Sequence, residues 1–422
     1  MGYKLDSGGG WEGAAVEWNA AFAAVHNANN RHDYCFEHKM TVEAPLPDEF
    51  PLDQPYHHLS AGPPCQPYSR AGKGLGASDE RDGIPAVLKA IAILHPTVVE
   101  IENVPTLLRF TDVVQGMRST LKALGYHVTS YQLNAADYGV PQKRVRLLVV
   151  GSLLGPLDAP PPGEGPVITV RDAIGEQSGF DAFRAYDAQL ALTEEQKMRA
   201  ERLDIMAGCV NFRELHPDEP ARTLTASNLA NNHGLMLRLR MEDGVTLQRP
   251  SVEQAAALQS FPIDFEFSEA HISRRQAYIA VGNAMPTQLG LHLTRVARQQ
   301  LQEAQDAYAT LVKVAEGAAR SQIGAVGETL VACNTSVAAG DSTGERSDVE
   351  NSGCDDLRVF SSVEHGSDLS APDGGASLRD EAVEASAEIC ASDHAESDAA
   401  PPQSKTVRIF AEWLLTMAAV SA

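Results

Sequence analysis

A single cysteine stands where a short apolar run, typical of a strand, gives way to a loop. The run HLSAGPPCQPYS places Cys65 directly after two prolines. Because prolines restrict the backbone, little conformational entropy remains to be lost when the thiol is aimed at a substrate. A lone cysteine is more often a small buried apolar residue, but Gln66 and Ser69 beside it are polar, which is unusual in a core. A nucleophilic thiol and a buried one are both open on this segment alone.

Two further segments place charged side chains at the ends or edges of predicted strands. The run VVEIENV is a predicted strand that ends at Glu102 and Asn103, and the run GVPQKRVR contains Arg144 and Arg146. Residues two apart on a strand share one face, so the two arginines lie side by side. Taken singly, a strand-end acid is most often solvated, and alternating arginines most often line an exposed edge. Neither segment alone predicts a site.

In this order, however, the three segments resemble the DNA (cytosine-5) methyltransferase family. GPPCQPYS is similar to the family's nucleophile loop, IENV to its glutamate motif, and GVPQKRVR to its Gln-x-Arg-x-Arg motif. EPARTLT at 219–225 resembles the motif after the family's target-recognition domain, and LQSFP with VGNAMP resembles its closing pair. The resemblance covers roughly residues 5–300. Five motifs in the family's order are far more specific than any one of them.

The resemblance implies transfer of a methyl group from S-adenosylmethionine to carbon 5 of cytosine in DNA. Cys65 would add to carbon 6 of the base and make carbon 5 nucleophilic. Glu102 would act at ring nitrogen 3, while Arg146 would contact the base carbonyl oxygen, with Arg144 beside it. Because a stacked base is out of reach, the target would flip out of the duplex. Further residues expected to line the substrate loop are Pro64, Gln66, Ser69, Asn103 and Gln142.

The cofactor end of the chain departs from the family pattern. The family opens with an apolar strand, Phe-x-Gly-x-Gly-Gly, a helix, a second strand and an acid for the ribose. Here LDSGGG is similar to a shortened version, with Asp6 in place of an aromatic residue, and Glu17 follows Gly10 by only seven positions. A crossover helix does not fit there, since comparable units use about 20 residues. We therefore expect a shortened first βα unit, although a flexible glycine loop is an alternative. The expected cofactor contacts are Ser7, Gly8, Gly10, Glu17, Glu37 and Asn283.

The elements that must position these residues alternate between strand and helix over residues 1–152, the predicted catalytic domain. This alternation is typical of a parallel α/β sheet. The family resemblance narrows the expected fold to a Rossmann-like, S-adenosylmethionine-dependent methyltransferase sheet. Apolar runs predict strands at 14–18, 57–61, 97–101, 127–133 and 145–151, and helical spacing predicts helices at 84–94 and 111–124.

The pattern changes after this domain. A proline-rich stretch opens residues 153–218, which we expect to be a small inserted target-recognition segment. Residues 219–316 return to the catalytic domain and include a predicted amphipathic helix at 287–315. Residues 317–405 are rich in Ala, Ser, Gly, Asp and Glu, which predicts a disordered acidic linker. A short apolar segment, 406–422, follows it.

The charge and the cysteine content limit the partners and the cellular location that we expect for this protein. The 422 residues allow two or three domains. The formal net charge is −22, which ordinarily argues against a nucleic-acid partner, but residues 301–422 alone hold 21 acidic and 7 basic residues. Six cysteines without a CxxC pair indicate a reduced, intracellular protein, so we expect it in the cytoplasm. The start lacks a secretory signal and no apolar run reaches the ~20 residues that span a bilayer. We expect neither a membrane nor a metal.

Three functions remain open. We expect a monomeric DNA (cytosine-5) methyltransferase that acts on double-stranded DNA, with a restriction endonuclease counterpart in a restriction-modification system. The alternative is a cofactor-deficient, non-catalytic DNA-binding relative, which the shortened start favours. Intact Cys65, Glu102 and Arg146 favour the enzyme. A tRNA cytosine methyltransferase on the same scaffold is the third, but nothing in 153–218 marks that branch.

Overall fold

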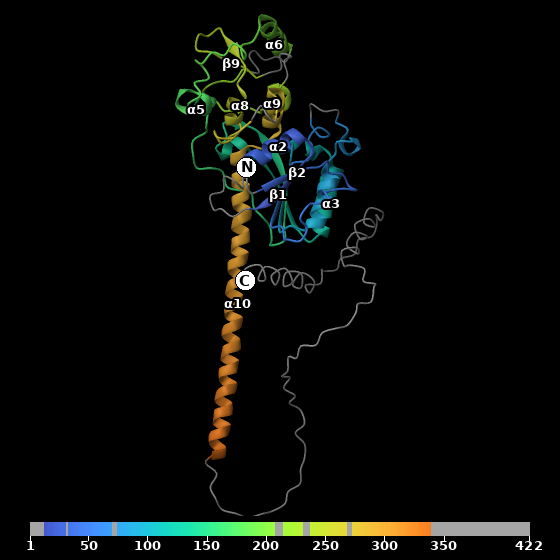
Figure 1. Ribbon diagram of the computed structural model, residues 1–422, viewed down its shortest axis with the longest axis vertical. Helices are drawn as coiled ribbons and strands as arrows, with labels where there is room; N and C mark the ends of the chain where they lie inside the picture. The colour runs from blue at the N-terminus through green and yellow to red at the C-terminus, as the bar shows by residue number, and fades with distance from the viewer. Residues whose placement is uncertain are drawn as a thin grey trace, which may run out of the picture. The chain divides into compact units, whose positions relative to one another are not determined.

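The computed structural model describes residues 12–30, 33–69, 74–206, 214–230, 237–267 and 272–338. Figure 1 labels the principal elements. The strands are β1 (Gly13–Glu17), β2 (Asp33–Glu37), β3 (His58–Ala61), β4 (Val98–Asn103), β5 (His127–Asn134), β6 (Gln142–Lys143), β7 (Val145–Ser152), β8 (Ala221–Arg222), β9 (Leu239–Arg240) and β10 (Leu247–Gln248). The α-helices are α2 (Ala20–Asn29), α3 (Ile84–Leu94), α4 (Thr111–Ala123), α5 (Val170–Ile174), α6 (Glu194–Met206), α7 (Ala226–Ala230), α8 (Val252–Leu258), α9 (Arg274–Asn283) and α10 (Thr287–Ala338). Short 3-10 turns are η1 (Gly76–Ser78), η2 (Pro105–Arg109), η3 (Ala135–Tyr138) and η4 (Glu176–Ser178).

The described residues contain a four-stranded sheet with the strand order β3-β4-β7-β5. The five strands predicted from apolar runs are all present as β1, β3, β4, β5 and β7. The expectation of an all-parallel sheet is wrong, however, because β7 runs antiparallel to both β4 and β5. The connection from β5 to β7 is too short for the crossover that parallel neighbours need, so the chain turns back on itself.

Helices cover both faces of this sheet. Val99 and Ile101 of β4 pack against α3 and α4, whereas Val98 and Leu148 point to the opposite face and pack against Leu289 and the following turns of α10. Side chains alternate along a strand, so Glu102 shares the face of Val98, and Arg146 shares that of Leu148. The fold is therefore layered α/β, as predicted.

A separate parallel pair, β1 and β2, is joined by α2 (Figure 1). Asn19 begins α2, and its side chain accepts hydrogen bonds from the amides of Ala21 at 3.1 Å and Phe22 at 3.3 Å. The register aligns Glu17 with Glu37 at the carboxyl ends of the two strands. Sequence analysis predicted β1 but neither α2 nor β2, because α2 is rich in alanine and lacks a clear apolar stripe.

The strands on the β1 side are less enclosed than the rest. β4 and β7 are almost entirely buried, but no residue of β1 or β3 is buried. Among the described residues, β1 pairs only with β2, and β3 only with β4. Inner strands of a parallel sheet are normally covered on both faces. β1 and β3 are therefore less enclosed than the inner strands β4 and β7.

Residues 170–281 share one hydrophobic core, which joins α5 to α7, α8 and α9. The predicted recognition segment, 153–218, contributes Val170, Ile174, Ala182, Phe183 and Leu215 to this core. The predicted boundary at 218/219 therefore does not separate two cores.

The last helix is longer than predicted. The expected helix at 287–315 continues in the structure to Ala338. The expectation of disorder from residue 317 is therefore wrong for 317–338. Residues 317–338 contain five alanines, and alanine has the highest helix propensity even without tertiary packing. Residues 339–405 of the predicted linker, and the segment 406–422, lie outside the described residues. Within the described helices, none combines the length and apolarity needed to cross a membrane.

Candidate active site

The loop after β3 holds Cys65 between two fixed points. Before the thiol, the Pro63 carbonyl accepts a hydrogen bond from Asn103 Nδ2 at 3.4 Å. After it, the Tyr68 amide donates to the Cys65 carbonyl at 3.0 Å, and Thr106 Oγ1 donates to the Tyr68 carbonyl at 2.7 Å. Asn103 and Thr106 both come from the end of β4 and the turn beyond it. The strand that carries Glu102 therefore also sets the path of the cysteine loop.

Packing holds the same loop from the other side. A Cβ on Gly83 would lie 2.9 Å from the Pro64 ring, so the start of α3 lies directly against the two prolines. The Tyr68 ring meets Phe110 edge to face, with centroids 5.2 Å apart. Pro64 and Gln66 remain exposed, while Ser69 is half-buried. The thiol is therefore held on a braced loop with polar, open flanks, rather than in the apolar core.

Glu102 and Arg146 form an ion pair beside this loop. Arg146 Nε lies 2.6 Å from Glu102 Oε1, and the side chains are only 9% and 18% exposed, respectively. β4 and β7 are neighbours, and their register sets Glu102 opposite Leu148, so Arg146 is its diagonal neighbour. A Cβ on Gly62 would lie 3.5 Å from Glu102 Oε2. The carboxylate thus reaches the backbone three residues before Cys65.

The charges of this pair act on the thiol. Burial raises the pKa of Cys65, and the nearby Glu102 carboxylate raises it further, while Arg146 and Arg144 lower it. The thiol is therefore mostly protonated at neutral pH, and a group that removes its proton or stabilises negative charge is needed for it to react.

We expect the alkylation of Cys65 by iodoacetamide to follow these charges. Because its pKa is raised, the thiolate forms only at high pH, so the rate rises with pH through a midpoint above the usual ~8.5 of a thiol. Glu102→Gln lowers this midpoint and Arg146→Met raises it. Mass spectrometry of the peptide that contains Cys65 measures the rate without interference from other cysteines. A midpoint below that of a free thiol, or shifts in the opposite directions, would contradict the arrangement.

Two predicted site residues have other partners than a substrate. The Gln142 side chain is fully buried. Its amide nitrogen donates to Gln259 Oε1 at 2.9 Å, and its oxygen accepts from the Leu224 amide at 2.9 Å. Arg144 is 2% exposed and donates to backbone carbonyls at Leu224, Gly282 and Ala284. Arg144 and Gln142 therefore hold segments of the protein together. This corrects the catalytic role expected for Arg144 and the substrate-loop position expected for Gln142.

The predicted cofactor residues are spread over three elements. Glu17 and Glu37 end the parallel strands β1 and β2. Glu17 is half-buried and accepts a hydrogen bond from the Asn19 amide at 2.8 Å, and burial raises its pKa. Glu37 and Asn283 are exposed. The expected contacts at Ser7, Gly8 and Gly10 lie outside the described residues.

Sequence analysis did not single out Trp18, although it directly follows Glu17. Its side chain is 66% exposed, which is unusual for so large an apolar group. An aromatic residue directly after a strand-end acid is the signal that could have found it. A flat, exposed indole at the carboxyl end of a strand is suited to stack against a planar ring.

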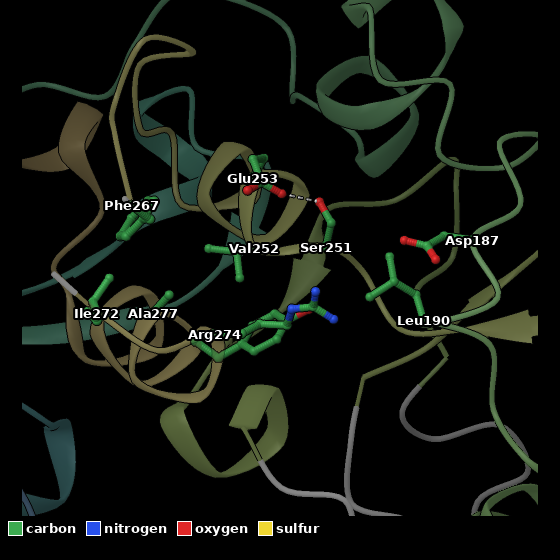
Figure 2. A pocket seen from close by; sticks show the side chains of 10 residues that line it. Asp187, Leu190, Ser251, Val252, Glu253, Phe267, Ile272, Arg274 and Ala277 are labelled. Carbon is green, nitrogen blue, oxygen red and sulfur yellow. Dashed lines mark hydrogen bonds between the residues drawn. The ribbon is translucent and has the colours of Figure 1, made fainter. Parts of the chain in front are cut away.

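Two hollows lie near these elements. One of about 310 Å³ lies between α2 and the junction of α9 with α10, and its lining includes Phe22, Phe261 and Met285. The other, of about 160 Å³, is lined by Asp187, Glu253 and Arg274 together with apolar side chains (Figure 2). No predicted site residue lines the second hollow, and we assign it no function.

Solved structures define the class of fold. A methyltransferase of Entamoeba histolytica, EhMeth, superposes with a TM-score of 0.54 at 15% identity and covers 71% of this chain and 94% of its own. The Dnmt2 methyltransferase of S. pombe gives a TM-score of 0.50 at 17% identity, over 68% of this chain and 91% of its own. The described fold is thus the one that these two methyltransferases share.

Sequence comparison defines the family. A family model described as C-5 cytosine-specific DNA methylase matches residues 5–158. The type II methyltransferase M.AplI of Arthrospira platensis is 33% identical over 245 residues, which cover 58% of this chain and 69% of that protein. M.MthTI of Methanothermobacter thermautotrophicus is 30% identical over 269 residues, 57% of this chain and 78% of that protein. The chain belongs to the C-5 cytosine-specific DNA methylase family, whose enzymes take their methyl group from S-adenosylmethionine.

Proposed function

We propose that this protein methylates carbon 5 of a cytosine in double-stranded DNA through a covalent adduct with Cys65. The observation that carries the proposal is the Glu102–Arg146 pair, with 2.6 Å between Oε1 and Nε, beside a braced cysteine loop. A nucleophile, a carboxyl group and a guanidinium group from three segments of the chain converge here. Such a set is suited to addition to a polar ring.

Each side chain has one task in this reaction. Cys65 Sγ bonds to carbon 6 of the base after losing its proton, and the electron pair of the 5,6 double bond moves to carbon 5. Glu102 holds a proton at ring nitrogen 3, while Arg146 donates to the base carbonyl oxygen and stabilises the charge that addition creates. Loss of the carbon-5 proton then restores the double bond as the carbon–sulfur bond breaks and Cys65 leaves with its electron pair. S-adenosylmethionine, when bound, supplies the methyl group that carbon 5 takes up before this elimination.

The target cytosine must leave the helix to reach these groups. Cys65 is half-buried, and the side chains of Glu102 and Arg146 are mostly buried. A stacked, paired base cannot present its ring atoms to side chains in such a place, so the base flips into the site.

The residues at the open edge of the sheet fit the cofactor. Ligands of α/β sheets bind beyond the carboxyl ends of the strands, where Glu17 and Glu37 lie. Glu17 is suited to bind ribose hydroxyls, and the exposed Trp18 to stack against adenine. Asn283 is an exposed amide that can bind a polar group of the cofactor. Ser7, Gly8 and Gly10 are expected to complete this site.

A second function has one observation in its favour. No residue of β1 is buried, so the strand that ends at Glu17 is only partly enclosed by the described residues. A relative that binds DNA and flips a base, but binds S-adenosylmethionine too weakly to turn over, would share this feature. The catalytic side chains favour the enzyme.

The names of two relatives bear on the biological system in which this protein acts. M.AplI and M.MthTI are named as type II methyltransferases. These names support the proposal that the protein acts on DNA in a restriction-modification system with an endonuclease counterpart. We further expect it to act inside the cell as a monomer.

Methyl transfer to unmodified DNA tests the proposal. The full chain is incubated with S-adenosylmethionine carrying a labelled methyl group and with double-stranded DNA of mixed sequence, and the product nucleosides are separated. We expect 5-methylcytosine. Label on an exocyclic nitrogen would overturn the proposal, as would transfer to tRNA alone. No transfer, with no binding of S-adenosylmethionine by calorimetry and intact DNA binding, would favour the second function.

A further inference from the structure

The end of α9 is stabilised by side chains from distant segments. The last carbonyls of a helix have no partner within it. The Val281 carbonyl accepts a hydrogen bond from Gln259 Nε2 at 2.7 Å, and the Gly282 carbonyl accepts one from Arg144 Nη1 at 3.3 Å. Arg144 Nη2 donates to the Ala284 carbonyl at 3.0 Å. The two carbonyls that flank Asn283 are therefore held by one guanidinium group.

The same guanidinium group holds a second segment. Arg144 Nη1 donates to the Leu224 carbonyl at 2.6 Å, in the motif at 219–225. The two segments also touch directly, since a Cβ on Gly282 would lie only 2.2 Å from the Ala226 amide nitrogen. Arg144 thus satisfies three backbone carbonyls from two segments that pack together. Its side chain is buried, so these contacts do not compete with water.

We infer that Arg144 is a positioning residue that fixes Asn283 for S-adenosylmethionine. Asn283 is exposed, although both of its neighbours are held by Arg144. Arg146, two residues after Arg144, is the residue proposed to bind the flipped base. One short segment therefore contains a base-binding residue and the residue that positions Asn283 for the cofactor. The inference rests on the proposed function, because it assigns Asn283 to the cofactor.

The geometry depends on a guanidinium group rather than on charge alone. Arginine presents five N–H donors in a planar fork, whereas lysine presents one ammonium group on a flexible stem. Lysine at position 144 keeps the charge but cannot reach carbonyls at Leu224, Gly282 and Ala284 together. Even a misplacement of about 1 Å by a distant substitution costs ~10²-fold in catalytic rate, so a small shift of a positioned group has a measurable effect.

The test compares cofactor binding with a reaction that needs no cofactor. Addition of Cys65 to the base makes the hydrogen on carbon 5 exchangeable with water. Release of tritium from DNA labelled at carbon 5 therefore measures the addition to the base without any contribution from the cofactor. For Arg144→Lys we expect the Kd for S-adenosylmethionine, measured by calorimetry, to rise about tenfold. Tritium release without cofactor should stay within about threefold of the wild type. The matched control, Lys143→Gln, removes an adjacent charge whose ion pair with Glu219 is exposed, and should change neither value.

Each outcome decides the inference. An unchanged Kd in a folded Arg144→Lys protein, or equal loss of binding and tritium release, would overturn it. Should Arg144→Lys fail to fold, Asn283→Ala provides the second test, because that side chain is exposed. It should raise the Kd about tenfold, and an unchanged Kd would refute the inference. Wild-type protein that binds S-adenosylmethionine but releases no tritium would instead contradict the proposed function.

Discussion

We expect Cys65→Ala to lose methyl transfer by ~10⁴-fold or more, because no other group can form the bond to carbon 6. The loss extends to tritium release from carbon 5 without cofactor, since that reaction uses the same addition. Cys65 lies on a loop braced by Asn103, Thr106 and the packing of Pro64 on Gly83. Removing one half-buried sulfur therefore leaves the fold and DNA binding intact. Single-turnover methylation, tritium release, thermal unfolding and DNA binding together measure the effect.

Cys35→Ala is the matched control. Cys35 is buried on β2, and burial raises the pKa of its thiol to about 11, so it is not a competing nucleophile at neutral pH. We expect this variant to keep its transfer rate. Residual methylation by Cys65→Ala within tenfold of the wild type would refute the covalent mechanism, even if the product is 5-methylcytosine.

Glu102→Gln should have the second largest effect. The substitution keeps the shape of the side chain but removes the negative charge and the group that holds a proton at ring nitrogen 3. We expect methyl transfer and tritium release to fall together by about 10²- to 10⁴-fold, as for loss of an acid–base group. DNA binding should change little. Rates with saturating cofactor and DNA give the loss in the chemical step.

Arg146→Met distinguishes a chemical role of Glu102 from a structural one. Arg146 forms an ion pair with the Glu102 carboxylate, with Nε 2.6 Å from Oε1. If both groups act on the same base, the double variant should lose less than the product of the two single losses. Full activity in Glu102→Gln with strong loss in Arg146→Met would show that Glu102 only orients the arginine, and would remove it from the mechanism.

Local patterns predicted most of the central sheet. Strands β4 and β7 are almost entirely buried, and their apolar residues, Val98, Val99 and Ile101 in β4 and 147–150 in β7, indicate strands in the sequence. The unit of α2 and β2 was missed, because its alanine-rich helix and short strand lack strong periodicity. The end of α10 was misplaced, because low aromatic content limits burial in a core but does not limit helix formation.

The sequence also indicated the residues of the candidate site, because Cys65, Glu102 and Arg146 each lie near the end or start of a predicted strand. Their proximity was implied by a family resemblance, and it depends on the pairing of β3 with β4 and of β4 with β7. Those pairings bring together residues about 40 positions apart in the chain. No local pattern specifies them.

Arg144 marks the limit of what the sequence alone determined. Sequence indicated five of the strands, the residue types of the candidate site and the family, because apolar periodicity and motif spacing are local properties. Only the tertiary structure decided that Arg144 faces Leu224, Gly282 and Ala284, which lie 80, 138 and 140 positions away. Every residue has the same backbone carbonyl group, so the sequence does not indicate which carbonyls a buried guanidinium group will bind.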